Sequence, residues 1–177
     1  MGFRSVNEMH NFKFDDCEVH GVEFRENSII LILEALIVKD SNSQNSNFTN
    51  SYAGTARLEF REYAINGACE AGCKVYNADN VLIDETEDIP ISTERVMEVI
   101  RDFQSIERCY LCSVDCIKGD ENADNKAASG DDHTEKTYLL EFELPLEDEV
   151  APKVYDIMLA ATDAIVTWEV YMNRVQN

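Results

Sequence analysis

The chain has 177 residues, of which 35 are Asp or Glu and 15 are Lys or Arg, so its formal charge is −20. A field of this sign repels phosphate backbones and anionic membranes and attracts basic protein surfaces. We therefore expect no direct binding to nucleic acid or membrane, and a basic protein as partner. A charge that serves solubility alone is the alternative.

The length fits one domain, and the content of 45% hydrophobic residues is enough to fill a core. The first residues lead into no apolar signal segment, and no stretch of about 18 apolar residues follows, so the expected location is the cytoplasm. We predict a loose N-terminus over residues 1–10 and a single domain over 11–177. Polar loops are expected near residues 40–53 and 118–135.

Alternating apolar and polar residues predict strands in the first half of the chain. Ala56, Leu58 and Phe60 alternate with charged residues in this way. Asn66-Gly67 predicts a turn after this strand. The predicted elements are a hairpin of Cys17–Phe24 with Ile29–Lys39, a strand within Gly54–Ile65, and a short hairpin of Lys74–Tyr76 with Val81–Ile83.

One helix is predicted after residue 92. Ser92 or Thr93 can cap it, Glu94 favours its N-terminus, and four apolar residues recur at helical spacing: Val96, Val99, Ile100 and Phe103. The opposite side of this helix is mostly acidic and should face water.

The second half again favours strands, over Cys109–Ile117 and Thr137–Leu144. For Lys153–Ala161 both helix and strand are open. The alternation from Ile165 to Tyr171 favours a terminal antiparallel hairpin, with its turn at Ala161–Ala164. The predicted fold is therefore α+β and β-rich, an antiparallel meander sheet or partial barrel with one or two packed helices.

The cysteines are the sharpest candidates for chemistry. The cluster Cys69, Cys73, Cys109, Cys112 and Cys116 could supply thiolates to a zinc ion, which makes a zinc-binding or metal-dependent protein the alternative function. Against it, Cys109 and Cys112 fall in a strand pattern rather than on a turn. We therefore favour thiols in the core and expect no metal or cofactor.

No recognised catalytic motif occurs in the sequence, so the prediction leans away from an enzyme and names no catalytic residue. One of the three densest acidic runs, residues 84–88, directly precedes the predicted helix. Together the run and the exposed side of the helix form the predicted partner-binding face: Asp84, Glu85, Glu87, Asp88, Glu94, Glu98 and Asp102.

The segment Phe14-Asp15-Asp16-Cys17-Glu18-Val19-His20-Gly21-Val22-Glu23-Phe24, with the apolar strand that follows, resembles the start of small bacterial proteins. Some of these are similar to immunity proteins of polymorphic toxin systems. The resemblance covers Phe12 to Ile65 and implies a small cytosolic binding protein without catalysis. The function expected is that of an acidic binding protein, an immunity protein that occludes a basic toxin such as a nuclease.

Overall fold

The computed structural model describes residues 2–15, 17–103, 108–118, 135–145 and 152–174. It is rich in strands and contains one α-helix among these residues, so the predicted α+β, β-rich class is confirmed. The elements are β1 (Phe3–Val6), the 3-10 helix η1 (Met9–Asn11), β2 (Phe12–Lys13), β3 (Cys17–Arg25), β4 (Ser28–Glu34), β5 (Ile37–Val38), β6 (Ser51–Ala53), β7 (Ala56–Arg61), β8 (Ala64–Glu70), β9 (Lys74–Tyr76), β10 (Leu82–Glu85), β11 (Ile89–Pro90), α1 (Thr93–Phe103), β12 (Tyr110–Lys118), β13 (Lys136–Leu144), β14 (Lys153–Ala161), β15 (Asp163–Trp168) and β16 (Tyr171–Arg174).

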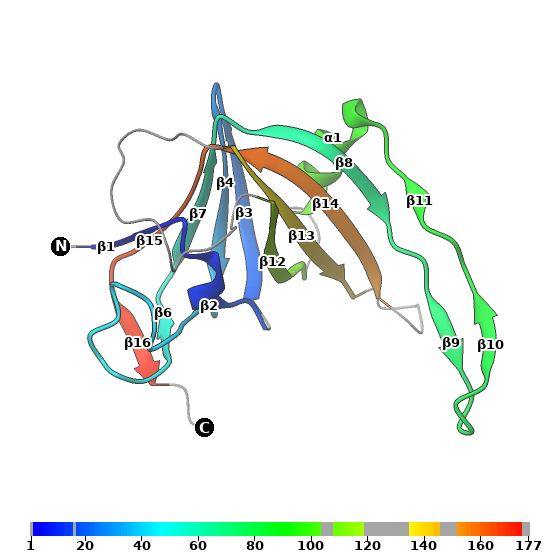
Figure 1. The fold of residues 1–177 in the computed structure, drawn as a ribbon, viewed down its shortest axis with the longest axis horizontal. Coiled ribbons are helices and arrows are strands. Elements are labelled where there is room, and N and C mark those ends of the chain that lie inside the picture. The colour runs from blue at the N-terminus through cyan, green and yellow to red at the C-terminus, as the bar shows by residue number, and fades with distance from the viewer. Residues whose placement is uncertain (1, 16, 104–107, 119–134, 146–151, 175–177) are drawn as a thin grey trace.

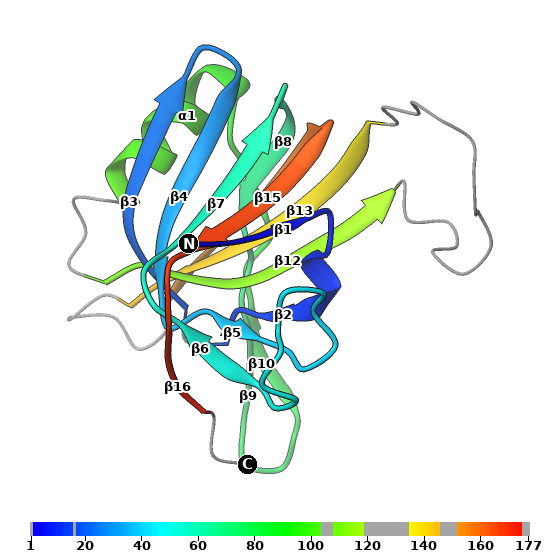
Figure 2. The same ribbon diagram turned by 90° about the vertical axis from the view of Figure 1, so that its left-hand side faces the viewer.

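Ten strands form one curled sheet in the order β1-β15-β7-β4-β3-β12-β13-β14-β8-β11, and every neighbouring pair is antiparallel (Figure 1). A second sheet, β16-β6-β5-β2, lies at one end of the first, as Figure 2 shows. The strands β9 and β10 pair only with each other. The predicted hairpins β3–β4 and β9–β10 are both confirmed.

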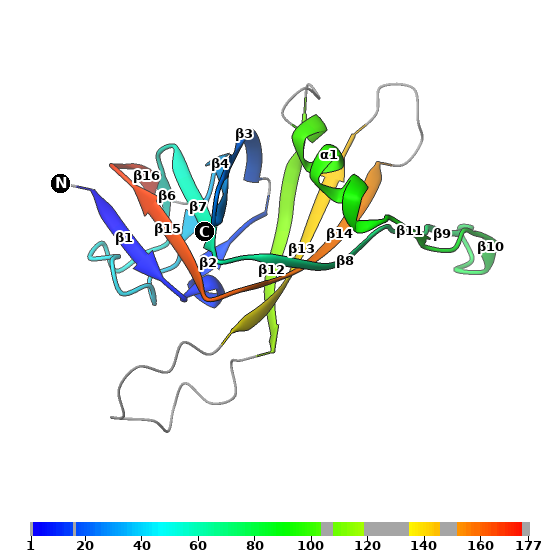
Figure 3. The same ribbon diagram turned by 90° about the horizontal axis from the view of Figure 1, so that it is seen from above.

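Two long segments, residues 56–70 and 153–168, give the large sheet its curl. Each bends once, and the two pair on both sides of the bend: β7 with β15, and β8 with β14. At the corner the Thr162 amide donates to the Arg61 carbonyl over 3.0 Å, and Glu62 turns the chain with a φ of 46°. The two halves of the sheet therefore face each other across the core (Figure 3).

The predicted turn at Asn66-Gly67 is wrong, because both residues lie inside β8. Gly67 pairs with Met158 and Ile65 pairs with Leu159, so Asn66 is the extra residue of a β-bulge. A bulge needs one unpaired residue and increases the local twist, which an Asn-Gly step accommodates. The chain turns instead at Glu62.

The predicted terminal hairpin is right in its strands and wrong in its pairing. Residues 153–161 form a strand, which settles the open choice against helix, but β14 and β15 do not pair with each other. At Thr162 the chain bends, so that β14 lies in one half of the sheet and β15 in the other. The predicted strand Ile29–Lys39 is also divided: Ala35, with a φ of 60°, separates β4 in the large sheet from β5 in the small one.

The N-terminus predicted to be loose is instead part of the sheet, since β1 pairs with β15 from Phe3 to Val6. The polar loop after β5 is held by a buried amide: Asn45 Nδ2 donates to the carbonyls of Val38, Lys39 and Thr49 at 2.9–3.1 Å. The other predicted polar loop lies almost wholly outside the described residues, in 119–134.

Aromatic side chains link the halves of the core. The buried rings of Phe60 on β7 and Tyr138 on β13 lie 5.2 Å apart between centroids, although their strands belong to opposite halves of the sheet. Near the small sheet, Trp168 stacks on Phe3 at 5.3 Å and meets Phe12 edge-on at 6.1 Å. Burial of these large apolar surfaces is the main source of stability for the curled sheet.

The predicted helix is confirmed as α1, and its apolar side faces the sheet. Val96, Ile100 and Phe103 are buried, and the Phe103 ring lies 4.8 Å from Phe142 on β13 and 5.8 Å from Tyr155 on β14. The Ser92 carbonyl accepts the first amide hydrogen bonds of the helix. The helix therefore covers the inner face of the β13–β14 half.

We predict that Phe103→Ala lowers the free energy of unfolding by about 3 kcal/mol, because it removes the ring that anchors α1 and leaves a cavity. Urea unfolding followed by circular dichroism measures this loss. Glu98→Ala, an exposed change on the same helix, should stay within about 0.5 kcal/mol of wild type. Equal losses in the two variants would contradict the anchoring role of Phe103.

Candidate partner-binding surface

A hairpin arm, residues 72–88, extends from the edge of the large sheet, well away from the body (Figures 1 and 3). Its turn is shaped by Asn77, whose side-chain oxygen accepts the amides of Asp79 and Val81 at 2.9 Å. Asn80 completes the turn with a φ of 59°. Asn is one of the few residues that adopt this left-handed conformation readily, so the sequence of the turn fits its shape.

The arm exposes apolar side chains that a folded chain usually buries. Every residue from Cys73 to Pro90 is exposed. Five of the ten large apolar side chains exposed in the described residues lie on the arm: Val75, Tyr76, Val81, Leu82 and Ile83. Clustered apolar exposure of this kind marks interaction surfaces, whereas single exposed apolar residues need no explanation.

The root of the arm is closed by hydrogen bonds between its two ends. Gly72 N donates to Asp88 Oδ1 at 2.8 Å, Cys73 N donates to Thr86 Oγ1 at 2.8 Å, and Thr86 N donates to Cys73 O at 2.9 Å. A side chain at Gly72 would overlap the Thr86 carbonyl oxygen, so only glycine allows the two ends of the arm to approach this closely. These bonds fix the direction in which the arm leaves the sheet.

Four of the predicted partner-binding residues lie on the arm, and all four are exposed: Asp84, Glu85, Glu87 and Asp88. Two of them also have structural partners, because Glu85 pairs with Lys74 at 2.8 Å and Asp88 holds the root. The arm contains five acidic residues and one lysine, a formal charge of −4.

The other three predicted residues, Glu94, Glu98 and Asp102, lie on the exposed side of α1. This helix packs on the inner face of the sheet through Phe103 and Phe142. Asp88 directly precedes β11, whose Pro90 pairs with Cys69, and Cys69 in turn pairs with Asp156 on the outer face of β14. Asp88 therefore lies beside the outer face at this edge. The structure therefore divides the predicted surface into two parts, one on each side of the β8–β11 edge.

An acidic row that sequence analysis missed continues from Asp88 across the outer face. Asp156 on β14 pairs in register with Glu141 on β13. Partial burial, together with the charge of Asp88, raises the pKa of Asp156. Partial burial and the carboxylates of Asp156, Glu143 and Asp115 raise the pKa of Glu141. Asp156 and Glu141 lie 15 residues apart in sequence, and only the strand register brings them side by side.

The cysteines proposed as zinc ligands lie in separate places. Cys69 on β8 is three strands away from β12, which is roughly 14 Å at the usual strand spacing. All six cysteines are in the described residues and none forms a disulfide. Burial raises the pKa of the Cys17 and Cys109 thiols to about 12. Within the described ranges, no three side chains of the metal-ligating types gather into one group.

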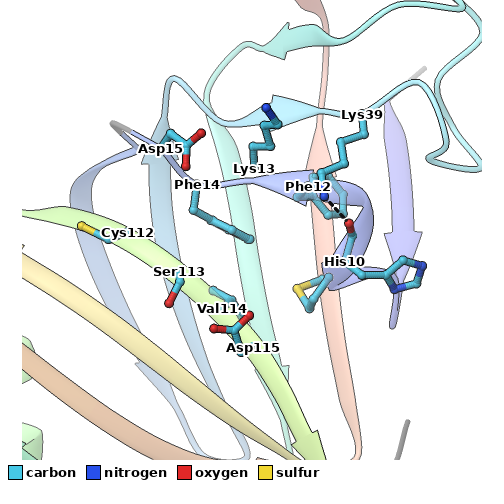
Figure 4. A pocket seen from close by; sticks show the side chains of 11 residues that line it. His10, Phe12, Lys13, Phe14, Asp15, Lys39, Cys112, Ser113, Val114 and Asp115 are labelled. Atoms are coloured by element: carbon cyan, nitrogen blue, oxygen red, sulfur yellow. Dashed lines mark hydrogen bonds between the residues drawn. The ribbon is translucent and has the colours of Figure 1, made fainter. Parts of the chain in front are cut away.

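An open groove of about 340 Å³ lies between η1, β2 and β12. Figure 4 shows Lys13, Lys39 and Asp15 on one side and Asp115 on the other. Lys39 Nζ already donates to the His10 carbonyl at 2.6 Å. Acidic and basic side chains both line the groove and favour no single class of ligand, so we assign no site here.

Searches of protein-family models, of curated proteins and of solved structures find no match to this chain. Within the described residues, no helix has the length and apolar character needed to cross a membrane.

We predict that Asp156→Asn stabilises the protein at pH 7 by roughly 0.5 kcal/mol, a value discounted for solvent screening. The folded-state pKa of Asp156 is raised, so its ionised form opposes folding above that pKa, and this cost disappears as the pH falls below the unfolded value near 4. Thermal unfolding at pH 7 and pH 3.5 measures the difference. The gain should vanish at the lower pH.

Glu169→Gln, which removes an exposed carboxylate from another part of the molecule, is the control and should change stability little at either pH. A loss of stability in Asp156→Asn at pH 7 would contradict the repulsion within the acidic row.

Proposed function

We propose that this protein is a non-enzymatic binding protein of the cytoplasm that occludes a basic protein partner, as an immunity protein occludes a toxin such as a nuclease. The observation that carries the proposal is the arm with exposed apolar side chains, which leaves the sheet between two acidic surfaces. One surface is the exposed side of α1, where three acids, Glu94, Glu98 and Asp102, outnumber the exposed Arg95 and Arg101. The other is the acidic row of Asp88, Asp156 and Glu141.

The charge of the whole chain supports this choice of partner. A net charge of −20 steers a basic protein toward the molecule and speeds encounter at low salt. A nuclease toxin has a basic surface where it binds phosphates, and an inhibitor that covers this surface needs acids in the same area. The arm supplies the apolar contact that charge alone does not give, since rim charges add more to association rate than to lasting affinity.

The resemblance of the segment from Phe12 to Ile65 to proteins similar to immunity proteins supports the same function. We expect a gene for a basic toxin beside the gene for this chain. Co-expression of the two tests the proposal directly: cells that produce the toxin should grow only when this protein is present, and the two proteins should purify as a complex. Growth arrest in the presence of the protein, without a complex, would refute the proposal.

The electrostatic part has its own test. Reversing three exposed acids, Glu87→Lys, Glu94→Lys and Glu98→Lys, should slow association with the toxin by about tenfold at low salt and flatten its salt dependence. Stopped-flow mixing at several salt concentrations measures both quantities. Asp88 is left unchanged because its carboxylate holds the root of the arm.

The control changes the net charge by the same amount at exposed acids far from the arm: Glu34→Lys, Asp40→Lys and Glu169→Lys. This control variant should associate with the toxin faster than the variant with Lys at positions 87, 94 and 98. Equal slowing by the two sets would show that only net charge matters and would place the docking surface elsewhere.

A further inference from the structure

The arm exposes apolar side chains on both of its faces. Tyr76 and Leu82 are directly paired across the hairpin and share one face, whereas Val75 pairs with Asp84 on the other. Ile83 lies at the irregularity between these pairs and is 62% exposed. Directly paired residues point to the same side of an antiparallel ladder, and neighbouring residues along a strand point to opposite sides. A flat partner could cover only one of these faces.

The hairpin also has backbone groups that lack strand partners. β9 and β10 form a sheet of two strands, so the outer edge of each is unpaired with any other described strand. An isolated two-stranded hairpin is marginally stable in water, and an extended edge readily accepts another strand. The shape and the hydrogen-bonding groups of the arm are thus those of an element that is completed by a partner.

Charge decides between a second copy of this chain and a different protein. Two copies would bring together arms of charge −4 on molecules of charge −20, so self-association is opposed by like charges. A basic partner meets no such repulsion. The acids near the arm root, on α1 and on the outer row, would then lie opposite Lys and Arg side chains at the rim.

We propose that the arm inserts into an apolar cleft of the basic partner, with Tyr76, Leu82 and Ile83 as the anchoring side chains and the flanking acids in contact with basic residues at the mouth of the cleft. This inference rests on the function proposed above and names the contact by which it is carried out. Apolar anchors at the centre of a charged rim are the usual arrangement of the residues that dominate protein–protein affinity.

The hydrogen bonds at the root of the arm orient it before the partner binds. Because the hydrogen bonds of Gly72, Cys73 and Thr86 already direct the arm outward, the free protein presents it in the orientation needed for insertion. A preformed element loses less conformational freedom on binding than a loop that must first become ordered.

The test measures binding of the purified toxin from the neighbouring gene by biolayer interferometry. The double variant Leu82→Ser, Ile83→Ser should raise Kd at least about tenfold, mainly through faster dissociation. The matched control is Phe48→Ser, Met172→Ser, which removes two exposed apolar side chains outside the arm and should change Kd less than about threefold.

Melting temperatures check that both variants fold, and Ile83→Ser alone replaces the double variant if the latter melts lower. If the wild-type protein does not bind the toxin, the proposed function fails and this inference fails with it. If the wild type binds and the arm variant binds within tenfold of it, or no more weakly than the control, the insertion is refuted while the proposed function stands.

Discussion

The pairing of residues 56–70 with residues 153–168 on both sides of one bend is the constraint on which the structure depends. The corner at Arg61 and Thr162 turns the sheet back on itself, so that Phe60 and Tyr138 meet across the core. Without it the strands would form a flatter sheet that leaves one apolar face in water. The same curl provides the inner face on which α1 packs, and on the outer face the pairing of β13 with β14 places Asp156 beside Glu141.

Because this core is closed by its own side chains, the apolar residues of the arm are not needed to complete it. They lie on a hairpin that leaves the edge of the sheet between α1 and the acidic row. The acids of that row repel one another, which works against folding. The fold itself requires neither the exposed apolar arm nor the repulsion among the neighbouring acids. A binding function would account for both features.

Sequence patterns were enough to predict the strands and the helix that depend on the residues within each segment. The alternation of Ala56, Leu58 and Phe60 gave β7, and the apolar spacing of Val96, Ile100 and Phe103 gave α1. The failures share a distant cause: Asn66 is a bulge only because its neighbours pair with Met158 and Leu159, about 90 residues later in the chain. The acidic row was missed for the same reason, whereas the acids of residues 84–88 adjoin in sequence and could be found.

The central claim is that the arm is the part of this protein that the partner covers. Hydrogen exchange with mass spectrometry, on the protein alone and in complex with the proposed basic partner, tests it most directly. The account predicts that amides of β9 and β10 exchange quickly in the free protein and become strongly protected in the complex. Protection confined to other strands, with the exchange of β9 and β10 unchanged, would contradict it.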